Sequence, residues 1–505
     1  MAFYFSLLGI ARLISAVTAA AALAPEQRSN KPLDLCRLVG AHFPGKVWFT
    51  NSSEYVDSQE SYYTLQEREL NPSCVFRPAR TADVSAFVKL VAANDRYPKN
   101  LSKPLFAVRS GGHTLWSGAA NVDGGITVDM RGMNSFGLSA DKKTASIGGG
   151  SNFIDVYPQL VPHNLTVLGA RMPGVAAGGF LTGGGKNFLA RKYGFACDNI
   201  FSYEVVLASG EVVYASASQN QDLWLALKGG SNNFGIITRF DVATHPLLGM
   251  WGGIVGFEYT PDTLSVHAQA FSDWMRPENV DELSDVAIIL GFVNGSFFIE
   301  DSLFYSAPVV SPPVFAEFTK LPGVTAQSLE LRSVAELVIF MGSILPATIP
   351  RSFELVYAFY NPDAATYLAL FQTWQAGIQQ VQGVQGLQIQ YLVQPMPVTN
   401  GTNSLGLPPH QPDITMVVLT AAWDNTVDDD TVTNGLQAIV TRHEAILDAK
   451  KLNIGYKYLN YADVTQNPIS TYGAANVARL RAVSRKYDPT GFFQARVPGY
   501  KLPKK

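Results

Sequence analysis

Two adjacent glycines followed by a histidine constrain this chain more than any other short stretch. Residues 109–113 read Arg-Ser-Gly-Gly-His, after an extended apolar segment at 104–108 and before a glycine-rich turn and strand at 124–130. Neighbouring glycines let consecutive backbone N–H groups converge on one point, an arrangement that binds pyrophosphate. His113 brings a nucleophilic imidazole beside that point. The pattern predicts a tethered dinucleotide, although an exposed turn with a capping histidine would look the same.

Further glycine clusters follow at 148–150, 178–185 and 229–235. None matches the G-x-G-x-x-G fingerprint, and Gly185-Lys186 lacks both the upstream glycine and the Ser/Thr of a P-loop. The sequence therefore predicts neither a Rossmann nor a Walker unit. Each cluster alone reads as a plain turn, whereas several together suggest backbone that approaches one long, flat ligand from many sides.

The order of these motifs resembles that of the berberine bridge enzyme-like flavoproteins, which have a PCMH-type FAD-binding domain and belong to the vanillyl-alcohol oxidase superfamily. The segments 193–199 and 222–236 continue the same order. The C-terminal Tyr-Leu-Asn-Tyr-Ala-Asp at 458–463 is similar to the family's terminal signature. The resemblance covers nearly the whole chain. It implies a two-domain α+β fold with an inserted sheet-plus-helices substrate domain, and FAD as the cofactor.

The resemblance also implies residue roles around the flavin. His113 would carry FAD covalently, and Met172 stands where many relatives have a second linking cysteine, so we expect a single tether. Phe180 replaces a frequent histidine, so another donor or dipole must stabilise the anionic reduced flavin. Val175 occupies a place where valine accompanies reactivity toward dioxygen. The residues expected to line the flavin are Arg109, Ser110, Gly111, Gly112, Gly178, Gly179, Gly183, Gly184, Asp198, Asn199, Gly230, Asn233, Phe234, Gly235, Ile236 and Asn460.

A tyrosine is the expected base. Hydride transfer from a substrate C–H requires that a neighbouring proton leave at the same time. The resemblance implies Tyr461 for this role, with Tyr458 in reserve, while Asn460 and Asp463 orient the strand. An ordinary phenol, with a pKa of about 10, needs nearby positive charge or hydrogen bonding to act near neutral pH. The alternative is that both tyrosines simply pack in the core.

The composition of the chain and its lack of other motifs argue against other classes of protein. The 505 residues are 47% hydrophobic and 16% charged, which predicts a globular protein with more than one core. A net charge of −3 without dense basic runs argues against a nucleic-acid partner. The remaining histidines show no clustered ligand spacing, so no metal site is predicted, and the chain has no G-x-S-x-G elbow.

The lengths and the order of the expected helices and strands predict that the chain has three parts. Short strands and helices alternate over residues 30–250, the expected FAD-binding domain. Long amphipathic helices alternate with apolar strands over 251–450, the expected substrate domain. Residues 451–505 return to the FAD domain. Expected helices lie at 81–91, with Thr81 as the cap, and at 153–161, 261–275, 363–380 and 430–449, with a terminal one through Val477, Leu480 and Val483. Expected strands lie at 126–130, 144–148, 285–292, 353–360 and 414–421, with a hairpin around Ser209-Gly210.

The N-terminus and the cysteines suggest secretion. Residues 1–24 are apolar and end in small residues, as in a signal peptide, with a retained amphipathic anchor as the alternative; no later stretch predicts a membrane span. Cys36 and Cys74 could bridge in an oxidising compartment, and the same early pair is a disulfide in the family. Cys197 would then be a buried free thiol. Five sequons agree with secretion, at Asn51, Asn100, Asn164, Asn294 and Asn400.

Together these observations predict a secreted or lumenal FAD-linked oxidase that uses molecular oxygen to oxidise a small organic molecule, such as a secondary-metabolite intermediate. Three alternatives remain open at this point. They are a carbohydrate or alcohol oxidase, a flavin-bound cyclase without net redox change, and a carrier or structural protein that has lost its flavin. The sequence does not predict the oligomeric state.

Overall fold

The computed structural model describes residues 31–96, 103–346 and 348–504. The predicted signal peptide at 1–24 lies outside the described residues, as does the sequon at Asn100. The other four sequon asparagines are exposed. Every helix within the described ranges is too short or too polar to cross a membrane.

The N-terminal part contains a four-stranded sheet in the order β1-β2-β4-β3. Its last three strands are parallel, and they place the glycine-histidine loop directly after β3. The strands are β1 (Val47–Trp48), β2 (Cys74–Phe76), β3 (Phe106–Arg109) and β4 (Ile126–Asp129), with helices α1 (Lys31–His42), α2 (Ser53–Glu60), α3 (Leu65–Arg68) and α4 (Thr81–Ala93).

Helix α4 has the predicted apolar face, because Val84, Phe87, Val88 and Val91 are all buried. The predicted cap is wrong by one position. Arg80 occupies the N-cap without a side-chain hydrogen bond, and Thr81 is the first helical residue. The Thr81 hydroxyl instead donates to Glu204 on a neighbouring strand, so tertiary packing has taken the capping group.

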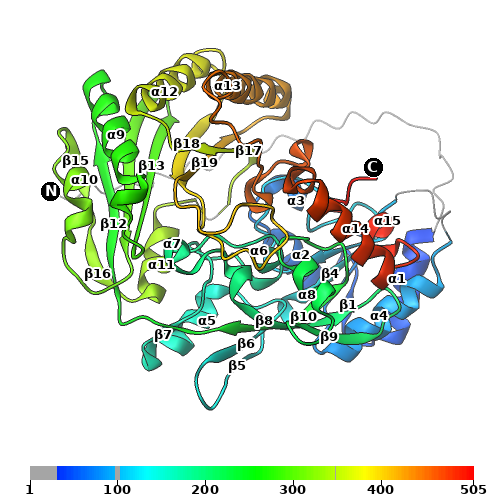
Figure 1. Ribbon diagram of the computed structural model, residues 1–505. Coiled ribbons are helices and arrows are strands. Elements are labelled where there is room, and N and C mark those ends of the chain that lie inside the picture. Colours follow the sequence, from blue (N-terminus) through cyan, green and yellow to red (C-terminus); the bar gives the residue numbers. More distant parts are fainter. Residues whose placement is uncertain (1–30, 97–102, 347, 505) are drawn as a thin grey trace.

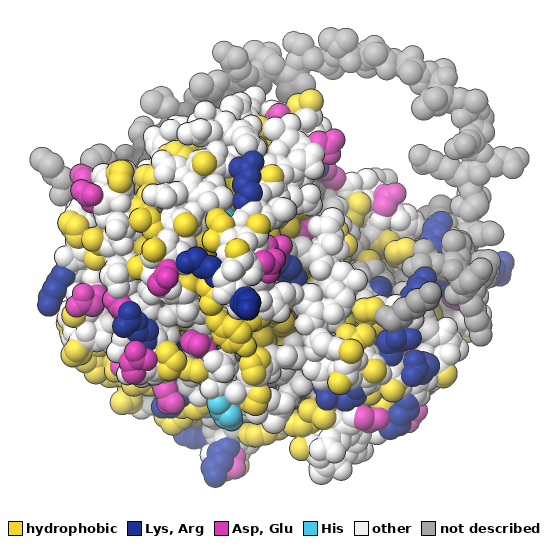
Figure 2. Space-filling model, turned by 45° about the horizontal axis from the view of Figure 1, so that its top comes forward, with side chains coloured by type: hydrophobic (Ala, Val, Ile, Leu, Met, Phe, Trp, Pro, Cys, Tyr) yellow, Lys and Arg dark blue, Asp and Glu magenta, His cyan; other side chains and the backbone are white. Residues whose placement is uncertain are grey.

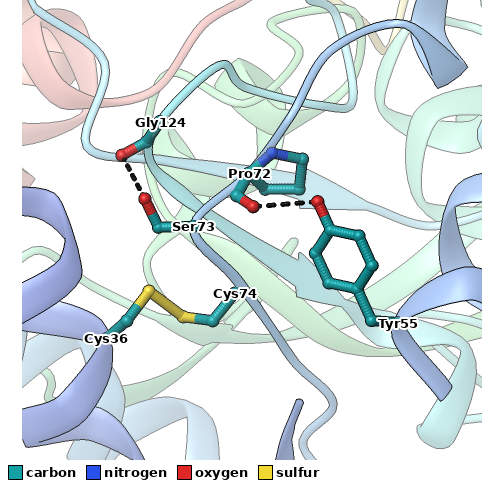
Figure 3. The surroundings of a disulfide bond; sticks show 6 residues. All are labelled: Cys36, Tyr55, Pro72, Ser73, Cys74 and Gly124. Atoms are coloured by element: carbon teal, nitrogen blue, oxygen red, sulfur yellow. Dashed lines mark hydrogen bonds between the residues drawn. A yellow bond between two sulfur atoms is a disulfide. The ribbon is translucent and has the colours of Figure 1, made fainter. Parts of the chain in front are cut away.

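A disulfide between Cys36 and Cys74 ties α1 to β2, as predicted (Figure 3). Hydrogen bonds on either side hold the same strand entry: Ser73 Oγ donates to the Gly124 carbonyl at 2.9 Å, and the Tyr55 hydroxyl donates to the Pro72 carbonyl at 2.9 Å. Cys197 is a buried free thiol, also as predicted.

A five-stranded antiparallel sheet follows, in the order β5-β6-β10-β8-β9. The predicted hairpin at Ser209-Gly210 joins β8 to β9, and the predicted strand at 144–148 is β6. The elements of this part are β5 (Phe136–Leu138), β6 (Thr144–Gly148), β7 (Leu165–Thr166), β8 (Ile200–Val206), β9 (Val212–Ser216), β10 (Ile236–Ala243), β11 (His245–Pro246), α5 (Phe153–Leu160), α6 (Ala177–Thr182), α7 (Ala190–Tyr193) and α8 (Gln221–Leu227).

The middle of the chain builds an eight-stranded antiparallel sheet in the order β15-β12-β14-β13-β18-β19-β17, with β16 paired to β12. The predicted strands at 285–292, 353–360 and 414–421 are β13, β17 and β19. The strands are β12 (Met250–Phe257), β13 (Ser284–Val293), β14 (Ser296–Tyr305), β15 (Val324–Gln327), β16 (Glu330–Arg332), β17 (Arg351–Tyr360), β18 (Gln388–Pro395) and β19 (Ile414–Trp423).

The predicted long helices cover one face of this sheet (Figure 1). They are α9 (Pro261–Trp274), α12 (Ala364–Ile378) and α13 (Asp429–Ala449), and α12 packs between the other two. An aromatic-rich core lies between helices and sheet, with Trp374 and Tyr391 fully buried. The opposite face of the sheet therefore faces the N-terminal half of the chain. Helix α11 (Val334–Ser343) lies against β12 and β16, and the short helix α10 (Ala316–Thr319) packs on α9.

The C-terminal segment returns to the first part of the chain, where Figure 1 shows α14 (Ala474–Tyr487) and α15 (Phe492–Arg496) near α1 and α4. Phe492 joins the core that contains both disulfide cysteines, and the Leu105 N–H donates to the Arg496 carbonyl at 2.8 Å. The apolar face of α14 is buried as predicted. These contacts bring residues 458–463, which precede α14, to the middle of the molecule.

Candidate functional site

A cavity of about 880 Å³ lies between the two halves of the chain. One wall consists of the loop 110–116 after β3, the segment 170–182 around α6, and the C-terminal segment 458–462. The other wall is the uncovered face of the eight-stranded sheet, with α11 at its edge. Segments far apart in the sequence thus meet around one cavity.

The backbone of the glycine-histidine loop requires glycine at two positions. Gly112 has a φ of +75°, which favours glycine. A Cβ at Gly111 would come within 2.5 Å of the Gly174 carbonyl, and one at Gly112 within 2.6 Å of the Tyr62 ring. Within the described part of the chain, no group accepts a hydrogen bond from the N–H groups of Gly111, Gly112 and His113. These three adjacent donors at the cavity wall are free to bind an anionic group.

His113 is held as a neutral imidazole at the cavity wall. Its ring stacks on Tyr63, with the ring centroids 4.1 Å apart and the planes at 10°. Burial lowers the pKa of His113 to about 4, against which a bond to its own backbone acts weakly. The imidazole is therefore unprotonated near neutral pH, and one of its nitrogens carries a free electron pair.

About half of the predicted flavin contacts line this cavity. They are Ser110, Gly111, Gly112, His113, Gly178, Gly179, Gly235, Ile236 and Asn460, together with both predicted tyrosines, Tyr458 and Tyr461. The positions singled out as departures from the family pattern, Met172, Val175 and Phe180, line it as well. The sequence resemblance thus identified residues from both ends of the chain that the fold brings together.

The other predicted contacts do not line the described cavity and instead belong to the packed structure around it. Arg109 is buried, with its guanidinium 3.8 Å from the centre of the Tyr62 ring and Nη2 bonded to Ser61 Oγ at 2.9 Å. Asp198 accepts from the Phe195 N–H at 3.2 Å and from Asn403 Nδ2 at 2.6 Å. The remaining members of this group are Gly183, Gly184, Asn199, Gly230, Asn233 and Phe234.

Packing explains why several of these positions are glycine. A Cβ at Gly183 would overlap the Asn460 side-chain oxygen, and one at Gly230 would overlap the Ala226 carbonyl. Asn233 Nδ2 donates to the Gly230 carbonyl at 2.8 Å and to the Tyr500 carbonyl at 2.9 Å, which ties the C-terminal segment to this part of the wall. Glycine spacing alone could not separate close backbone packing from ligand contact.

The two tyrosines have different surroundings. The buried Tyr458 hydroxyl accepts from the N–H groups of Gly185 at 2.7 Å and Lys186 at 2.9 Å. Burial raises the pKa of Tyr458 above its ordinary value, with a further rise from nearby Tyr461. Tyr458 therefore fixes the glycine turn 183–185. Tyr461, at the end of the short 3₁₀ helix η7 (Leu459–Tyr461), is half-buried and lines the cavity.

A cation lies next to the Tyr461 hydroxyl. Arg171 Nη2 approaches that oxygen to 3.4 Å, and the same nitrogen donates to Gln394 Oε1 at 2.9 Å. Arg171 Nη1 lies 3.2 Å from Asp285 Oδ2. Burial acts to lower the pKa of Arg171, but Tyr461 and Asp285 outweigh it, so the pKa is raised. A positive charge therefore lies beside the Tyr461 hydroxyl at the cavity wall.

Lys186 completes this cluster, since its Nζ donates to Asp285 Oδ1 at 2.7 Å. Burial lowers the pKa of Lys186 to about 8, and Asp285 opposes that effect only in part. Two cations therefore share one carboxylate beside the cavity. The sequence analysis missed Arg171, Lys186 and Asp285, because they come from separate segments with no shared spacing.

The sheet wall carries polar side chains among apolar ones. Gln390 on β18, Thr420 on β19 and Glu354 on β17 line the cavity, and all three are half-buried. Burial, followed by the charge of Asp463, holds the pKa of Glu354 well above its usual value, although a hydrogen bond with Thr420 acts against this. Burial likewise raises the pKa of Glu300 on β14.

Figure 2 shows the outer surface of one face of the molecule. Charged side chains of both signs are interspersed there with hydrophobic and neutral ones. This agrees with the small net charge of the chain, −3.

Comparisons with known proteins identify the family. A model of the FAD-binding domain matches residues 72–216, and the "berberine and berberine like" model matches residues 457–497. The FAD-dependent monooxygenase tpcD of Cochliobolus heterostrophus is 32% identical over 457 residues, which cover 87% of this chain and 86% of that protein.

Solved structures show the same fold. 6-Hydroxy-D-nicotine oxidase from Arthrobacter nicotinovorans superimposes with a TM-score of 0.74 at 21% identity and covers 92% of this chain and 98% of its own. Glucooligosaccharide oxidase from Acremonium strictum, described with a 6-S-cysteinyl, 8α-N1-histidyl FAD, gives 0.73 at 17% identity, with 94% and 100% covered. The fold is thus the predicted α+β architecture, which this chain shares with these FAD-linked oxidases. The chain belongs to the berberine bridge enzyme-like family of FAD-linked oxidoreductases.

Proposed function

We propose that this enzyme carries FAD bound covalently through His113 alone and oxidises a small organic molecule in the cavity, with Tyr461 as the base. The observation that carries the proposal is the meeting of three features around one cavity. They are the neutral imidazole of His113, the unpaired N–H groups of the preceding glycines, and the Tyr461 hydroxyl beside Arg171.

The residues present fit FAD. The free N–H groups of Gly111, Gly112 and His113 suit the anionic part of a dinucleotide. A Cβ at Gly179 would meet no other atom within 4 Å, so this exposed glycine leaves open space at the wall. Bound FAD would supply the acceptor for the substrate's hydride.

A single tether follows from the residues at the wall. His113 is unprotonated near neutral pH and has the free electron pair that a bond to carbon requires. Met172 also lines the cavity, but its thioether has no proton to lose and cannot form a thiolate bond. The histidyl and cysteinyl linkages named for glucooligosaccharide oxidase would thus be reduced here to the histidyl one.

Tyr461 would take the substrate proton while the C–H bond breaks. Arg171 holds a positive charge 3.4 Å from the tyrosine oxygen, beside the atom that would accept the proton. Tyr458 lacks such a partner, and its hydroxyl already accepts from two backbone N–H groups. We therefore assign Tyr458 to positioning rather than to proton transfer.

The proposal also covers the roles of the domains, the final electron acceptor and the compartment. Residues 30–250 with 451–505 would bind FAD and residues 251–450 the substrate, with molecular oxygen as final acceptor because Val175 lines the cavity. The Cys36–Cys74 disulfide supports a secretory compartment. The similarity to the FAD-dependent monooxygenase tpcD supports a flavin-dependent redox reaction, which we propose belongs to secondary metabolism.

The test is anaerobic mixing of the purified enzyme with a panel of phenols, benzylic alcohols, sugars and amines. An oxidoreductase predicts bleaching of the flavin by its substrate, and hydrogen peroxide when air is admitted. A non-redox cyclase would convert substrate while the flavin stays oxidised, and that result would replace this proposal.

A further inference from the structure

Three buried cations from the N-terminal half of the chain gather at one part of the cavity wall. Arg171 and Lys186 line the cavity, and their side chains are only 14% and 1% exposed. Arg191 on α7 is also buried, with its guanidinium carbon 4.0 Å from the centre of the Trp274 ring. All three cations interact with Asp285, which lies at the start of β13.

One carboxylate serves both of the cations that line the cavity. Asp285 Oδ2 lies 3.2 Å from Arg171 Nη1, and Asp285 Oδ1 lies 2.7 Å from Lys186 Nζ. Among the described residues, no other carboxylate forms an ion pair with either cation. Although burial lowers the pKa of Lys186 to about 8, its ammonium group is still mostly protonated at pH 7. One negative charge is therefore shared by two positive ones, and a net positive charge remains beside the cavity.

Both of these cations keep hydrogen-bond donors that have no partner. Arg171 donates through Nη1 and Nη2 to Asp285, Gln394 and Tyr461, and none of the described residues accepts from its Nε. Lys186 Nζ carries three protons and, within the described part of the chain, donates only to Asp285. A buried cation with unused donors is costly, so an anionic group that accepts from them gains affinity.

The acidic side chains of the cavity do not supply the missing negative charge. Among the described residues that line the cavity, Glu300 and Glu354 are the ones with a carboxyl group. Burial raises the pKa of both, and the charge of Asp463 adds to the rise at Glu354. A raised pKa favours the uncharged carboxyl. The positive side of the cavity therefore has no counterpart of opposite charge on the other wall.

We propose that Arg171, supported by the charge of Lys186, binds an acidic oxygen group of the substrate in its anionic form, such as a carboxylate, beside Tyr461. Arg171 lies 3.4 Å from the hydroxyl of the proposed base, so the acidic group and the C–H bond that is oxidised lie close together in the substrate. The substrate is then a small organic acid. This inference rests on the proposed function, because Tyr461 defines the reacting end.

The experiment is calorimetric titration of the purified holoenzyme at pH 7 with three probes of one skeleton. 2-Naphthoate is an anion, 2-naphthamide is its uncharged analogue, and 2-naphthylmethylamine is a cation. We expect 2-naphthoate to bind at least about tenfold more tightly than 2-naphthamide, the effect of one charge-assisted hydrogen bond, and the amine to bind most weakly. A change in flavin absorbance on binding shows that the probe lies in this cavity.

Two substitutions of the cluster should change 2-naphthoate binding in opposite directions. Lys186→Met removes a positive charge and should weaken 2-naphthoate about tenfold, while the affinity for 2-naphthamide stays nearly unchanged. Lys186→Gln removes the same charge but can still donate to Asp285, so it provides the same test if Lys186→Met does not fold. Asp285→Asn removes the shared negative charge at nearly constant size and should make 2-naphthoate bind more tightly.

Lys228→Met is the matched control, because Lys228 is as deeply buried as Lys186 but does not line the described cavity. It should leave the affinities for all three probes near those of the wild type, and the melting temperature of each variant reports its folding. Equal affinities of the wild type for 2-naphthoate and 2-naphthamide would overturn the inference. Equal losses of 2-naphthoate binding in Lys186→Met and Lys228→Met, or a loss in Asp285→Asn, would also overturn it.

The flavin in the same preparations tests the proposed function separately. If 2-naphthoate binds as expected while the flavin is absent or is reduced by no substrate, the redox function fails although the anion site stands. If substrate reduces the flavin but Lys186→Met binds 2-naphthoate like the wild type, the redox function stands and the anion site fails. A lower midpoint potential of the flavin in that variant would then assign the positive charge to the reduced cofactor instead.

Discussion

Arg171 Nη2 lies 3.4 Å from the hydroxyl oxygen of Tyr461, although 290 residues separate the two in the chain. Arg171 precedes the first turn of α6, and Tyr461 ends η7 in the C-terminal segment. The contact exists because the chain returns to its N-terminal half after building the eight-stranded sheet. It gives the proposed base a neighbouring positive charge.

Replacing this cation tests its role as a positioning residue. Arg171→Met should lower kcat at pH 7 by about tenfold to a hundredfold, because a charge-assisted contact is worth roughly 1.5–3 kcal/mol. Arg171→Lys keeps the positive charge and should restore part of the lost turnover. Equal losses of kcat in Arg171→Met and Arg171→Lys would instead indicate only a structural role.

The two tyrosines should separate turnover from stability. Tyr461→Phe removes the proposed proton acceptor and should reduce kcat by at least about a hundredfold while the flavin stays bound. Tyr458→Phe leaves the N–H groups of Gly185 and Lys186 unpaired and should cost about 1–3 kcal/mol in the free energy of unfolding. Steady-state kinetics and urea unfolding of both variants check this, and the reverse pattern would exchange their roles.

Lys186 should make stability depend on pH in a defined direction. Its pKa is lowered to about 8 by burial, whereas an unfolded lysine titrates near about 10.4. The unfolded state therefore binds more protons between these values, and stability rises with pH through that window. The melting temperature of the wild type relative to Lys186→Met should increase from pH 7.5 to pH 10. A flat difference would show that Lys186 titrates normally.

The disulfide should contribute mainly to stability. Cys36 and Cys74 are 38 residues apart, and closing a loop of that size restricts the unfolded chain by about 4 kcal/mol. Cys36→Ser with Cys74→Ser should lower the free energy of unfolding by up to that amount. The cavity lies elsewhere, so kcat of the folded variant should remain near that of the wild type, and a large fall in kcat would contradict this separation.

Local pattern was enough to predict much of the fold. Amphipathic periodicity located α9, α12 and α13 to within a residue or two at each end, because each helix buries one apolar face on the sheet. The Ser209-Gly210 turn predicted the β8–β9 hairpin. The cap of α4 was misplaced, since the Thr81 hydroxyl bonds to Glu204 on β8, a contact that only the tertiary fold creates.

The sequence predicted the part of the site whose conformation depends on its own local motif. The 110–113 loop carries its conformation in its own glycines, so its place at the cavity followed from local sequence. Arg171, Lys186 and Asp285 come together only after the sheet and the N-terminal half have packed. The same limit applies to Gln390, Thr420 and Glu354, whose alignment depends on strand register.

The most direct test of the central claim is mass spectrometry of proteolytic peptides from the purified, acid-denatured enzyme. The account predicts that the peptide containing His113 carries the added mass of FAD, that the peptide containing Met172 does not, and that His113→Ala releases its flavin on denaturation. An unmodified His113 peptide from the active wild-type enzyme would contradict it.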